Sequence, residues 1–400
     1  MRHKKISIDN SNIISPVHGK RILFFSGGTA LNFFIEEIKH HTYNTIHIIP
    51  ISDNGGSTAE ILRNLGGPAI GDIRSRLIRL AVNISPEVET LLSYRFHKHD
   101  KTVANDEFQQ LIQGVHPLLN GVKAKDLGYI LGPLVQFNKR ISIDEFDLRN
   151  GSVGNFFFKG CGFMFENPRV SALQTGINFF SGIAGIPHET KVIPVIDQDD
   201  AITIAVELEN GDIILGQNTI SHPGRLVDKN YACALQSPIK RLFYVDTDLP
   251  RYKIIDPTVN IYALNKLNEH PSIVFAPGSL YTSILPNLIL RGVGEAIAGN
   301  SRTKIACLNG YTDREFFGTA TNYIIKLTEG LNRYGELHNK PYDYIHKLFV
   351  VDGTKFDVNK KEIHKLGIEV IPVKKGSNST KAKPLYDTKA FTEQLLSGSI

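Results

Sequence analysis

Three glycine-rich turns near the amino terminus carry the residue types that bind phosphate. They lie at residues 26–29 (Ser-Gly-Gly-Thr), 53–57 (Asp-Asn-Gly-Gly-Ser) and 66–72 (Gly-Gly-Pro-Ala-Ile-Gly-Asp), each beside an apolar run and before a segment with helical periodicity. A glycine turn that opens a helix brings unpaired backbone N–H groups and the positive end of the helix dipole to one point. The pattern predicts a site for an anionic ligand.

Two aspartates in these turns are candidates for catalysis. Asp53 and Asp72 could transfer a proton, and Asp53 could hold a divalent cation such as Mg²⁺. Each also has a structural interpretation, because Asp53 can stabilise its own turn and Asp72 can cap a helix at residues 73–80. The remaining candidates for ligand binding in the first two turns are Gly27, Gly28, Thr29, Asn54, Gly55, Gly56 and Ser57. Residues 27–29 could equally be a tight strand-to-helix connection, and Ser57 a helix cap.

Two common nucleotide-binding fingerprints are absent from the first turn. The dinucleotide pattern Gly-x-Gly-x-x-Gly fails because Gly27 and Gly28 are adjacent, and Asn32 and Phe33 stand where the helix begins. The Walker pattern fails because no Gly-Lys-Ser or Gly-Lys-Thr occurs there. A hydride-transfer enzyme and a P-loop NTPase are therefore disfavoured.

The elements that position these turns follow an alternating strand and helix pattern. Apolar runs predict strands at 22–25 and 45–52 with a helix at 30–40 between them, and short helices follow at 57–63 and 72–80. The pattern returns later, with strands at 272–276, 304–308, 347–351 and 368–373 and helices at about 280–291, after 312 and at 360–366. This alternation predicts an α/β fold with a parallel, doubly wound sheet.

The middle of the chain departs from that alternation. Residues from about 82 to 150 have helical periodicity without strand-like runs, which predicts an α-rich insertion over the nucleotide edge. Shorter strands follow at 192–196, 202–208 and 212–216, and Glu-Asn-Gly joins the last two as an antiparallel hairpin. A mixed rather than purely parallel sheet is therefore expected.

Further polar residues are expected to complete the crevice. Arg74, near the start of the helix after the third turn, is the arginine that we would place against a phosphate. Asn155 follows a glycine before an apolar helix, although an asparagine in a turn is common without any function. Gly278, Ser279 and Tyr281 follow the strand at 272–276, where Tyr281 could stack on a ligand or simply pack.

Composition narrows the function classes. The net charge of +5 is modest and lies partly in lysines near both ends, and no aromatic-interleaved basic patch or zinc-spaced cluster occurs, so nucleic acid is not an expected partner. The three cysteines form no Cys-x-x-Cys pair, and no apolar run approaches the roughly 20 residues of a membrane helix. We expect a cytoplasmic protein with a flexible arm at 1–19, a folded unit at 20–373, and a loop and poorly anchored tail at 374–400.

Six ordered motifs between about residues 20 and 355 resemble those of the CofD-like superfamily. They lie at 27–29, 53–57, 67–74, 152–155, 216–220 and 277–283. This superfamily contains the 2-phospho-L-lactate transferases of deazaflavin coenzyme synthesis and the gluconeogenesis factors. The resemblance implies a Rossmann-like three-layer α/β/α fold with the ligand at the carboxyl ends of the strands. It also maps the family's crevice onto the candidate residues above, with Tyr281 resembling the aromatic that contacts a nucleotide sugar.

The two branches of the superfamily imply two functions. The gluconeogenesis-factor branch implies a regulator that binds a UDP-sugar or another nucleotide diphosphate. The transferase branch implies Mg²⁺-dependent transfer of a phospholactyl group from a guanosine diphosphate-linked donor, with release of GMP. Neither branch implies a tightly bound organic cofactor, and family members often associate as dimers, so the resemblance implies a homodimer as one option. Two departures, Ala30 in place of a glycine and the unusual segment 309–315, fall where an acceptor or sugar would be selected, so ligand binding is preferred to a specified reaction.

Overall fold

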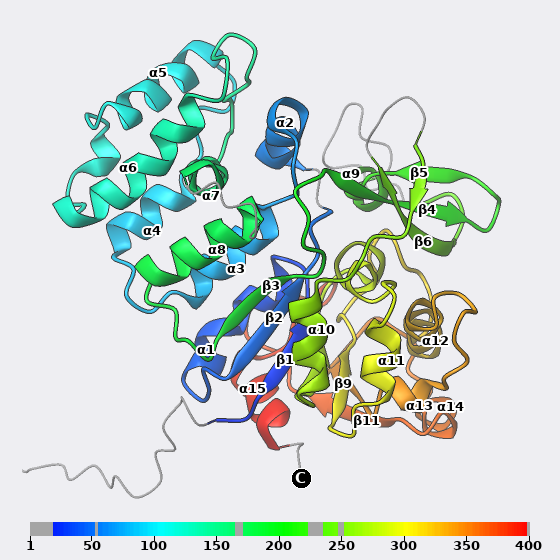
Figure 1. Cartoon of the computed structure of the whole chain (residues 1–400). Helices are drawn as coiled ribbons and strands as arrows, with labels where there is room; N and C mark the ends of the chain where they lie inside the picture. The colour runs from blue at the N-terminus through cyan, green and yellow to red at the C-terminus, as the bar shows by residue number, and fades with distance from the viewer. Residues whose placement is uncertain (1–18, 53–54, 165–170, 223–234, 247–251, 398–400) are drawn as a thin grey trace, which may run out of the picture.

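A parallel sheet forms the centre of the protein. The computed structural model describes residues 19–52, 55–164, 171–222, 235–246 and 252–397. In these ranges seven strands run in the order β11-β10-β9-β8-β1-β2-β3, and every pairing between them is parallel (Figure 1). Their bounds are β1 (Ile22–Phe25), β2 (Thr45–Ile49), β3 (Lys191–Pro194), β8 (Ser272–Phe275), β9 (Lys304–Cys307), β10 (Lys347–Val351) and β11 (Glu369–Val373).

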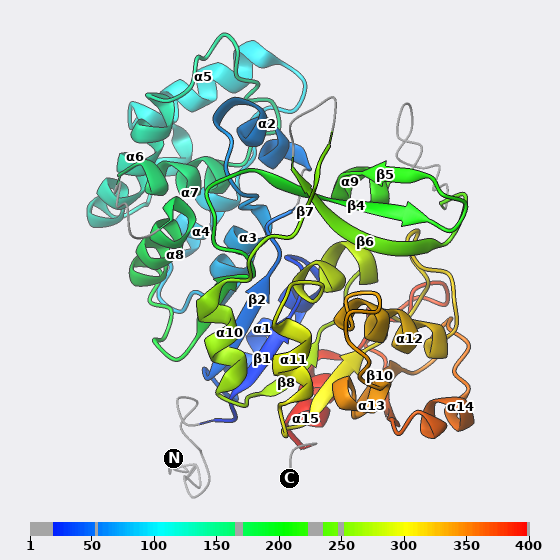
Figure 2. The ribbon, with the colours of Figure 1, turned by 45° about the vertical axis from the view of Figure 1, so that its right-hand side comes forward.

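Helices cover both faces of this sheet, which makes a Rossmann-like three-layer α/β fold. The chain moves from β1 to β2 and β3 in one direction, and from β8 to β11 in the other, so right-handed crossovers place the two sets of helices on opposite faces. One layer contains η2 (Ala30–Phe33), α1 (Ile35–Lys39) and α3 (Gly71–Leu80), with α15 (Thr388–Ser397) against α1. The other contains α10 (Ile261–Asn268), α11 (Val293–Ala298), α12 (Ala320–Leu331), α13 (Pro341–Tyr344) and α14 (Lys360–Lys365), as Figures 1 and 2 show.

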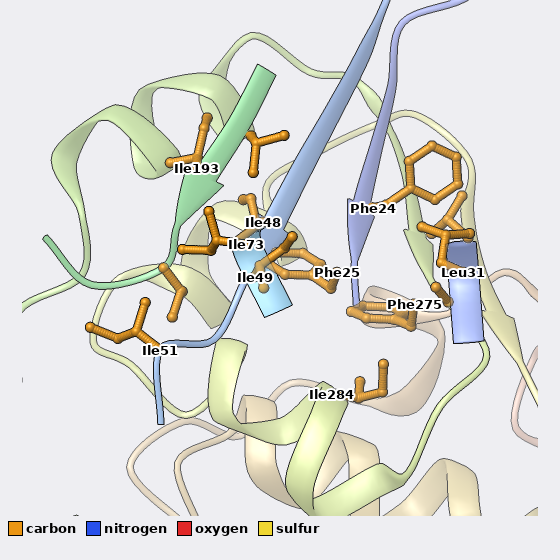
Figure 3. Close-up of a cluster of buried hydrophobic side chains, with 14 of the residues drawn as sticks. Phe24, Phe25, Leu31, Ile48, Ile49, Ile51, Ile73, Ile193, Phe275 and Ile284 are labelled. Carbon is orange, nitrogen blue, oxygen red and sulfur yellow. The ribbon is translucent and has the colours of Figure 1, made fainter. Parts of the chain in front are cut away.

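The core lies between these layers and explains why the strands are continuous apolar runs. All four residues of β1 and all five of β2 are buried, because a parallel sheet covered on both faces has no solvent side. The rings of Phe25 and Phe275, on the adjacent strands β1 and β8, stack with centroids 5.7 Å apart (Figure 3). This packing holds the carboxyl ends of β1 and β8 side by side.

A group of helices lies between β2 and β3. After α2 (Gly56–Leu65) and α3 come α4 (Pro86–Ser93), α5 (Lys101–Ile112), α6 (Ala124–Asn138), α7 (Val153–Met164) and α8 (Ala172–Ile183). Helices α6, α7 and α8 pack on one another in sequence, and α7 also contacts α4 (Figure 1). The described ranges contain no helix that is long and apolar enough to cross a membrane.

A second sheet corrects the expectation of a mixed central sheet. Four described strands, in the order β5-β4-β6-β7, are antiparallel: β4 (Ile202–Leu208), β5 (Ile213–Leu215), β6 (Ile239–Asp246) and β7 (Ile254–Ile255). The predicted hairpin is confirmed as β4 and β5, and the short helix α9 (Gln217–Ser221) follows it. The sheet assignment was wrong because pairing is a long-range property that the local apolar pattern does not encode.

The carboxyl-terminal segment is also corrected. The sequence predicted a loop and a poorly anchored tail at 374–400, yet α15 docks on the layer that contains α1. Phe391 is fully buried, and its ring lies 4.4 Å from that of Phe34, while the Tyr386 hydroxyl donates to the Phe349 carbonyl at 2.8 Å. Phe391 and Leu395 share one helix face, and their burial outweighs the weak apolar pattern of the segment as a whole.

Candidate functional site

The turns after β1 and β8 meet where the strand order reverses. The chain leaves β1 toward β2, whereas β8 pairs with the other side of β1, so the carboxyl ends of β1 and β8 form the topological switch point of the sheet. Ligands bind in the crevice at such points in open α/β sheets. Gly27 leaves no room for a side chain, since a Cβ there would lie 2.7 Å from the Ser283 hydroxyl. Glycine is therefore required where the two turns touch.

The third turn closes against the first. A Cβ on Gly28 would overlap the Asp72 carboxylate and lie 2.5 Å from its Cα, so the backbone of the first turn is in direct contact with Asp72. Helix α3 begins at Gly71, which places Asp72 in its first turn rather than at the predicted N-cap. The Asp72 carboxylate therefore lies at the edge of the first glycine turn, residues 26–29, and beside the positive end of α3.

A buried arginine holds the first turn from below. Arg76 is fully buried, and its guanidinium donates to the Gly27 carbonyl at 3.0 Å, the Ser26 hydroxyl at 3.1 Å and the Asn32 side-chain oxygen at 2.7 Å. It also contacts Nδ1 of His47 at 2.9 Å. Burial lowers the pKa of Arg76 to about 9, against an opposing effect of Asp72, and lowers the pKa of His47 well below its usual value. Arg76 therefore stays charged at neutral pH. The groups that accept its hydrogen bonds, the Gly27 carbonyl, the Ser26 hydroxyl and the Asn32 side-chain oxygen, are all uncharged.

A cavity of about 320 Å³ opens beside these turns, between the first, second and third glycine turns and the start of α7. Two arginines, Arg74 and Arg95, line it together. Burial lowers the pKa of Arg74 to about 10, with the neighbouring charge of Arg95 contributing, so Arg74 also stays charged at neutral pH. The other residues that line the cavity are Thr29, Gly55, Gly56, Ser57, Thr58, Gly71, Asp72, Ser75 and Asn155.

The Arg74 side chain lines this cavity and has a donor without a hydrogen-bond partner in the described part of the chain. Its Nη1 donates to the Leu92 carbonyl at 3.4 Å, whereas its buried Nε has no hydrogen-bond partner among the residues that the structure describes. A Cβ on Gly154 would lie 2.7 Å from the Arg74 Cδ, so this glycine makes room for the arginine. An unsatisfied buried donor is costly, and a ligand anion would satisfy it.

Asn155 also lines the cavity, at the start of α7. Its side-chain amide donates to the Ser57 hydroxyl at 2.9 Å and is 3.4 Å from the Thr58 hydroxyl. Its side-chain oxygen is buried and has no partner in the described part of the chain. Ser57 does not cap α2, which begins at Gly56, so its hydroxyl serves to orient Asn155.

The structure brings together some of the predicted residues and separates others. Seven of the predicted residues line this cavity: Thr29, Gly55, Gly56, Ser57, Asp72, Arg74 and Asn155. The turn that adjoins it contains Gly27 and Gly28. Gly278 and Ser279 lie across the switch point and do not line it, although Gly278 is held by two hydrogen bonds to the Asn309 side chain. Asp53 and Asn54 fall outside the described residues.

Tyr281 departs from its predicted role as a ligand contact. It is only 2% exposed, and its hydroxyl donates to the Ile239 carbonyl at 3.2 Å. The predicted helix at 280–291 is instead a π-helical turn, Leu280–Ile284, followed by a 3₁₀ turn at Leu285–Asn287 that contains Pro286. In this conformation Tyr281 packs beneath the second sheet rather than facing the cavity.

Several lining residues were not found from the sequence. Arg95 comes from the loop between α4 and α5, and no glycine turn or strand end marks it as a ligand contact. Arg76, which supports the first glycine turn without lining the cavity, was also not singled out from the sequence, although its position two residues after Arg74 places it on a different face of α3. A single carboxylate, that of Asp72, is provided by the lining residues, and the described residues contain no group of three or more metal-ligating side chains.

The fold and this cavity define a class: a Rossmann-like three-layer α/β protein with paired arginines at the carboxyl edge of its sheet. Residues 22–373 match the family model described as 2-phospho-L-lactate transferase CofD, and the chain therefore belongs to that family. This confirms the resemblance drawn from the six motifs.

Relatives extend to both yeast and bacteria. An uncharacterised protein of Saccharomyces cerevisiae is 29% identical over 381 residues, covering 78% of this chain and 83% of that protein. The gluconeogenesis factor of Bacillus subtilis is 24% identical over 359 residues, covering 88% and 89%. A solved structure of a UPF0052-family protein from Bacillus halodurans superposes with a TM-score of 0.64 at 20% identity, covering 94% of this chain and 99% of that one, which shows the shared fold.

Proposed function

We propose that this chain binds a nucleotide diphosphate or nucleotide sugar, with the phosphates between Arg74 and Arg95. The observation that carries this proposal is the buried Arg74 Nε, which faces no acceptor within the described residues while two guanidinium groups share one cavity. The positive charges of Arg74 and Arg95 repel each other, and an anion bound between them would offset this repulsion. Hydrogen bonds between guanidinium and phosphate groups are among the strong ones in proteins.

The size of the cavity supports a diphosphate at this position. About 320 Å³ is at the lower end of the range for small-molecule sites, which suits the phosphates rather than a whole nucleotide sugar. Gly55 and Gly56 also line the cavity, at the amino-terminal end of α2. Gly56 has a φ of 54°, a backbone conformation that favours glycine. The base and the sugar would then extend along the carboxyl edge of the sheet.

We propose a regulatory role in carbon metabolism for this binding, which the relatives named gluconeogenesis factors support. The transferase described by the family model is the alternative, in which an acceptor hydroxyl attacks a donor phosphorus. Asp53, with or without Asp72, would hold Mg²⁺ together with the ligand's phosphates, because Mg²⁺ sites of this kind use one or two carboxylates together with phosphate oxygens, and of the two Asp72 lies among the described lining residues. The bound ion would neutralise charge on the diphosphate. We favour binding without transfer, since Ala30 and the unusual segment 309–315 fall where an acceptor would be selected, whereas the phosphate-binding turns are present.

Calorimetry with UDP-glucose, GDP and GMP, each with Mg²⁺ and with EDTA, tests the proposal. Arg74→Met should weaken binding at least tenfold, the loss expected for a charge-assisted contact of about 1.5–3 kcal/mol. Arg79→Met is the matched control, because Arg79 lies on the same helix but is exposed and paired with Glu89 at 3.7 Å. Unchanged affinity in Arg74→Met, or no binding of any nucleotide, would refute the proposal. Release of GMP from a guanosine diphosphate-linked donor would identify the transferase instead.

A further inference from the structure

Two acids, the buried Glu315 and the half-buried Asp313, lie behind the turn that follows β8. Glu315 is 2% exposed, and one of its oxygens accepts from the hydroxyls of Ser221 and Thr282, both at 2.6 Å, while the other accepts from the Thr282 backbone N–H at 3.1 Å. Asp313 accepts from the backbone N–H groups of Glu315 and Phe316 at 3.0 and 2.9 Å. Neither acid has an ion pair with a base among the described residues.

This acid pair is linked to the phosphate-binding turns through the π-helical turn Leu280–Ile284. Glu315 holds Thr282, and the next residue, Ser283, lies against Gly27 in the first turn. Asp313 is hydrogen-bonded to the side chain of Ser279, which adjoins Gly278 at the switch point. Glu315 therefore contacts the π-helical turn, and that turn contacts the first glycine turn, which adjoins the cavity proposed for a bound anion.

We propose that Glu315 makes the affinity of the site for an anionic ligand depend on pH, because binding of the anion and ionisation of this buried carboxyl oppose each other. The inference rests on the proposed function and names a regulation of the same site. Binding would draw a proton onto Glu315, and a rise in pH that ionises Glu315 would weaken binding, since the two effects are one coupling free energy.

The environment of Glu315 sets the pH range of this coupling. Burial, together with the negative charge of Asp313, raises the pKa of Glu315 to about 7, and its hydrogen bonds to Ser221 and Thr282 oppose the shift. The carboxyl is therefore mainly neutral at pH 6 and mainly ionised at pH 8. Both states can be satisfied in place, because one of the two hydroxyls can change from donor to acceptor when the carboxyl carries its single proton, while the other continues to donate.

Several other titratable groups lie near Glu315. Burial raises the pKa of Asp313, of the Tyr281 and Tyr323 phenols and of the Cys307 thiol, so the last three stay neutral from pH 6 to pH 8. Arg314, a basic residue, lies between the two acids in the chain. His222 directly follows Ser221 and belongs to the residue type that ordinarily titrates near neutrality, so it needs its own control.

Calorimetric titration of the full chain with UDP-glucose at pH 6, 7 and 8 tests the inference. This probe is a diphosphate diester and lacks the phosphate monoester ionisation near pH 6. For the wild type we expect affinity about fivefold weaker at pH 8 than at pH 6, the scale of a charge interaction through protein. Proton uptake at pH 7 should appear as a binding heat that varies with the ionisation enthalpy of the buffer.

Glu315→Gln and His222→Gln separate the candidates. Glu315→Gln should bind at pH 8 as tightly as the wild type does at pH 6, with neither pH dependence nor proton uptake, whereas His222→Gln should retain both. Wild-type binding that does not change with pH, or a pH dependence that survives in Glu315→Gln, would overturn the inference and leave the proposed function intact. No binding at any pH would refute the proposed function and this inference with it.

Discussion

Replacing Arg76 with methionine tests how the first glycine turn is held. The guanidinium of Arg76 is fully buried, and three of its hydrogen bonds go to the Gly27 carbonyl, the Ser26 hydroxyl and the Asn32 side-chain oxygen. Methionine fills a similar volume but donates no hydrogen bond. The variant therefore removes the bonds and the charge while keeping the site packed.

The expected loss of stability follows from the acceptors that remain. The Gly27 carbonyl would be left buried and the Asn32 oxygen half-buried without their donor, and an unsatisfied buried group costs about 1–3 kcal/mol. The Ser26 hydroxyl can rotate, and removal of a buried charge recovers part of the cost. We expect the free energy of unfolding to fall by about 2–4 kcal/mol. Nucleotide affinity should also fall, because the turn loses its support and the site loses a positive charge.

Urea unfolding and calorimetric titration with UDP-glucose would measure both effects. Arg79→Met, on the same helix but exposed, should leave stability and affinity within about 0.5 kcal/mol of wild type. Arg76→Lys should retain part of the affinity, since it keeps the charge with fewer donors in a different geometry. Wild-type stability in Arg76→Met would show that the turn does not depend on this network. Lost stability with unchanged affinity would show that the turn does not shape the site.

Three further changes have expected outcomes. Gly28→Ala should abolish nucleotide binding and lower the melting temperature because its Cβ would overlap Asp72, whereas Gly182→Ala, in helix α8 with open space around it, should be neutral or stabilising by up to about 1 kcal/mol; equal melting temperatures would contradict the close contact. Phe391→Ala should destabilise the protein by about 3–5 kcal/mol in urea unfolding, and a loss below about 1 kcal/mol would show that α15 is not part of the core. The raised pKa of Glu315 means that the stabilising contribution of this residue is complete below about pH 4.5 and is lost as pH rises through about 7. The free energy of unfolding of the wild type, relative to that of Glu315→Gln, should therefore fall by about 3 kcal/mol between pH 5 and pH 8. A difference that stays constant across this range would show that Glu315 does not titrate there.

Local patterns predicted the strands and their order along the chain. Ile22–Phe25 and Ser272–Phe275 are confirmed as strands, because continuous apolar runs between glycine turns are typical of strands that are buried on both faces. The candidate site was predicted in part for the same reason. The carboxyl ends of parallel strands meet at one edge, so Thr29, Gly56 and Asp72 could be assigned to one crevice without coordinates.

Other features depend on contacts between segments that are distant in the chain. The second sheet is one, since β4 pairs with β6 across a long connection that no local pattern specifies. Another is the docking of α15, where Phe391 packs against Phe34.

By itself, the sequence determined the family, the parallel sheet and the turns that bear glycine, because these depend on residue type and spacing along the chain. Only the tertiary structure decided which charges share the site. It placed Arg95 beside Arg74, buried Arg76 under the first turn and put Glu315 behind Thr282. The physical reason is that charge interactions depend on distance and burial, which are properties of the folded chain rather than of its residue order.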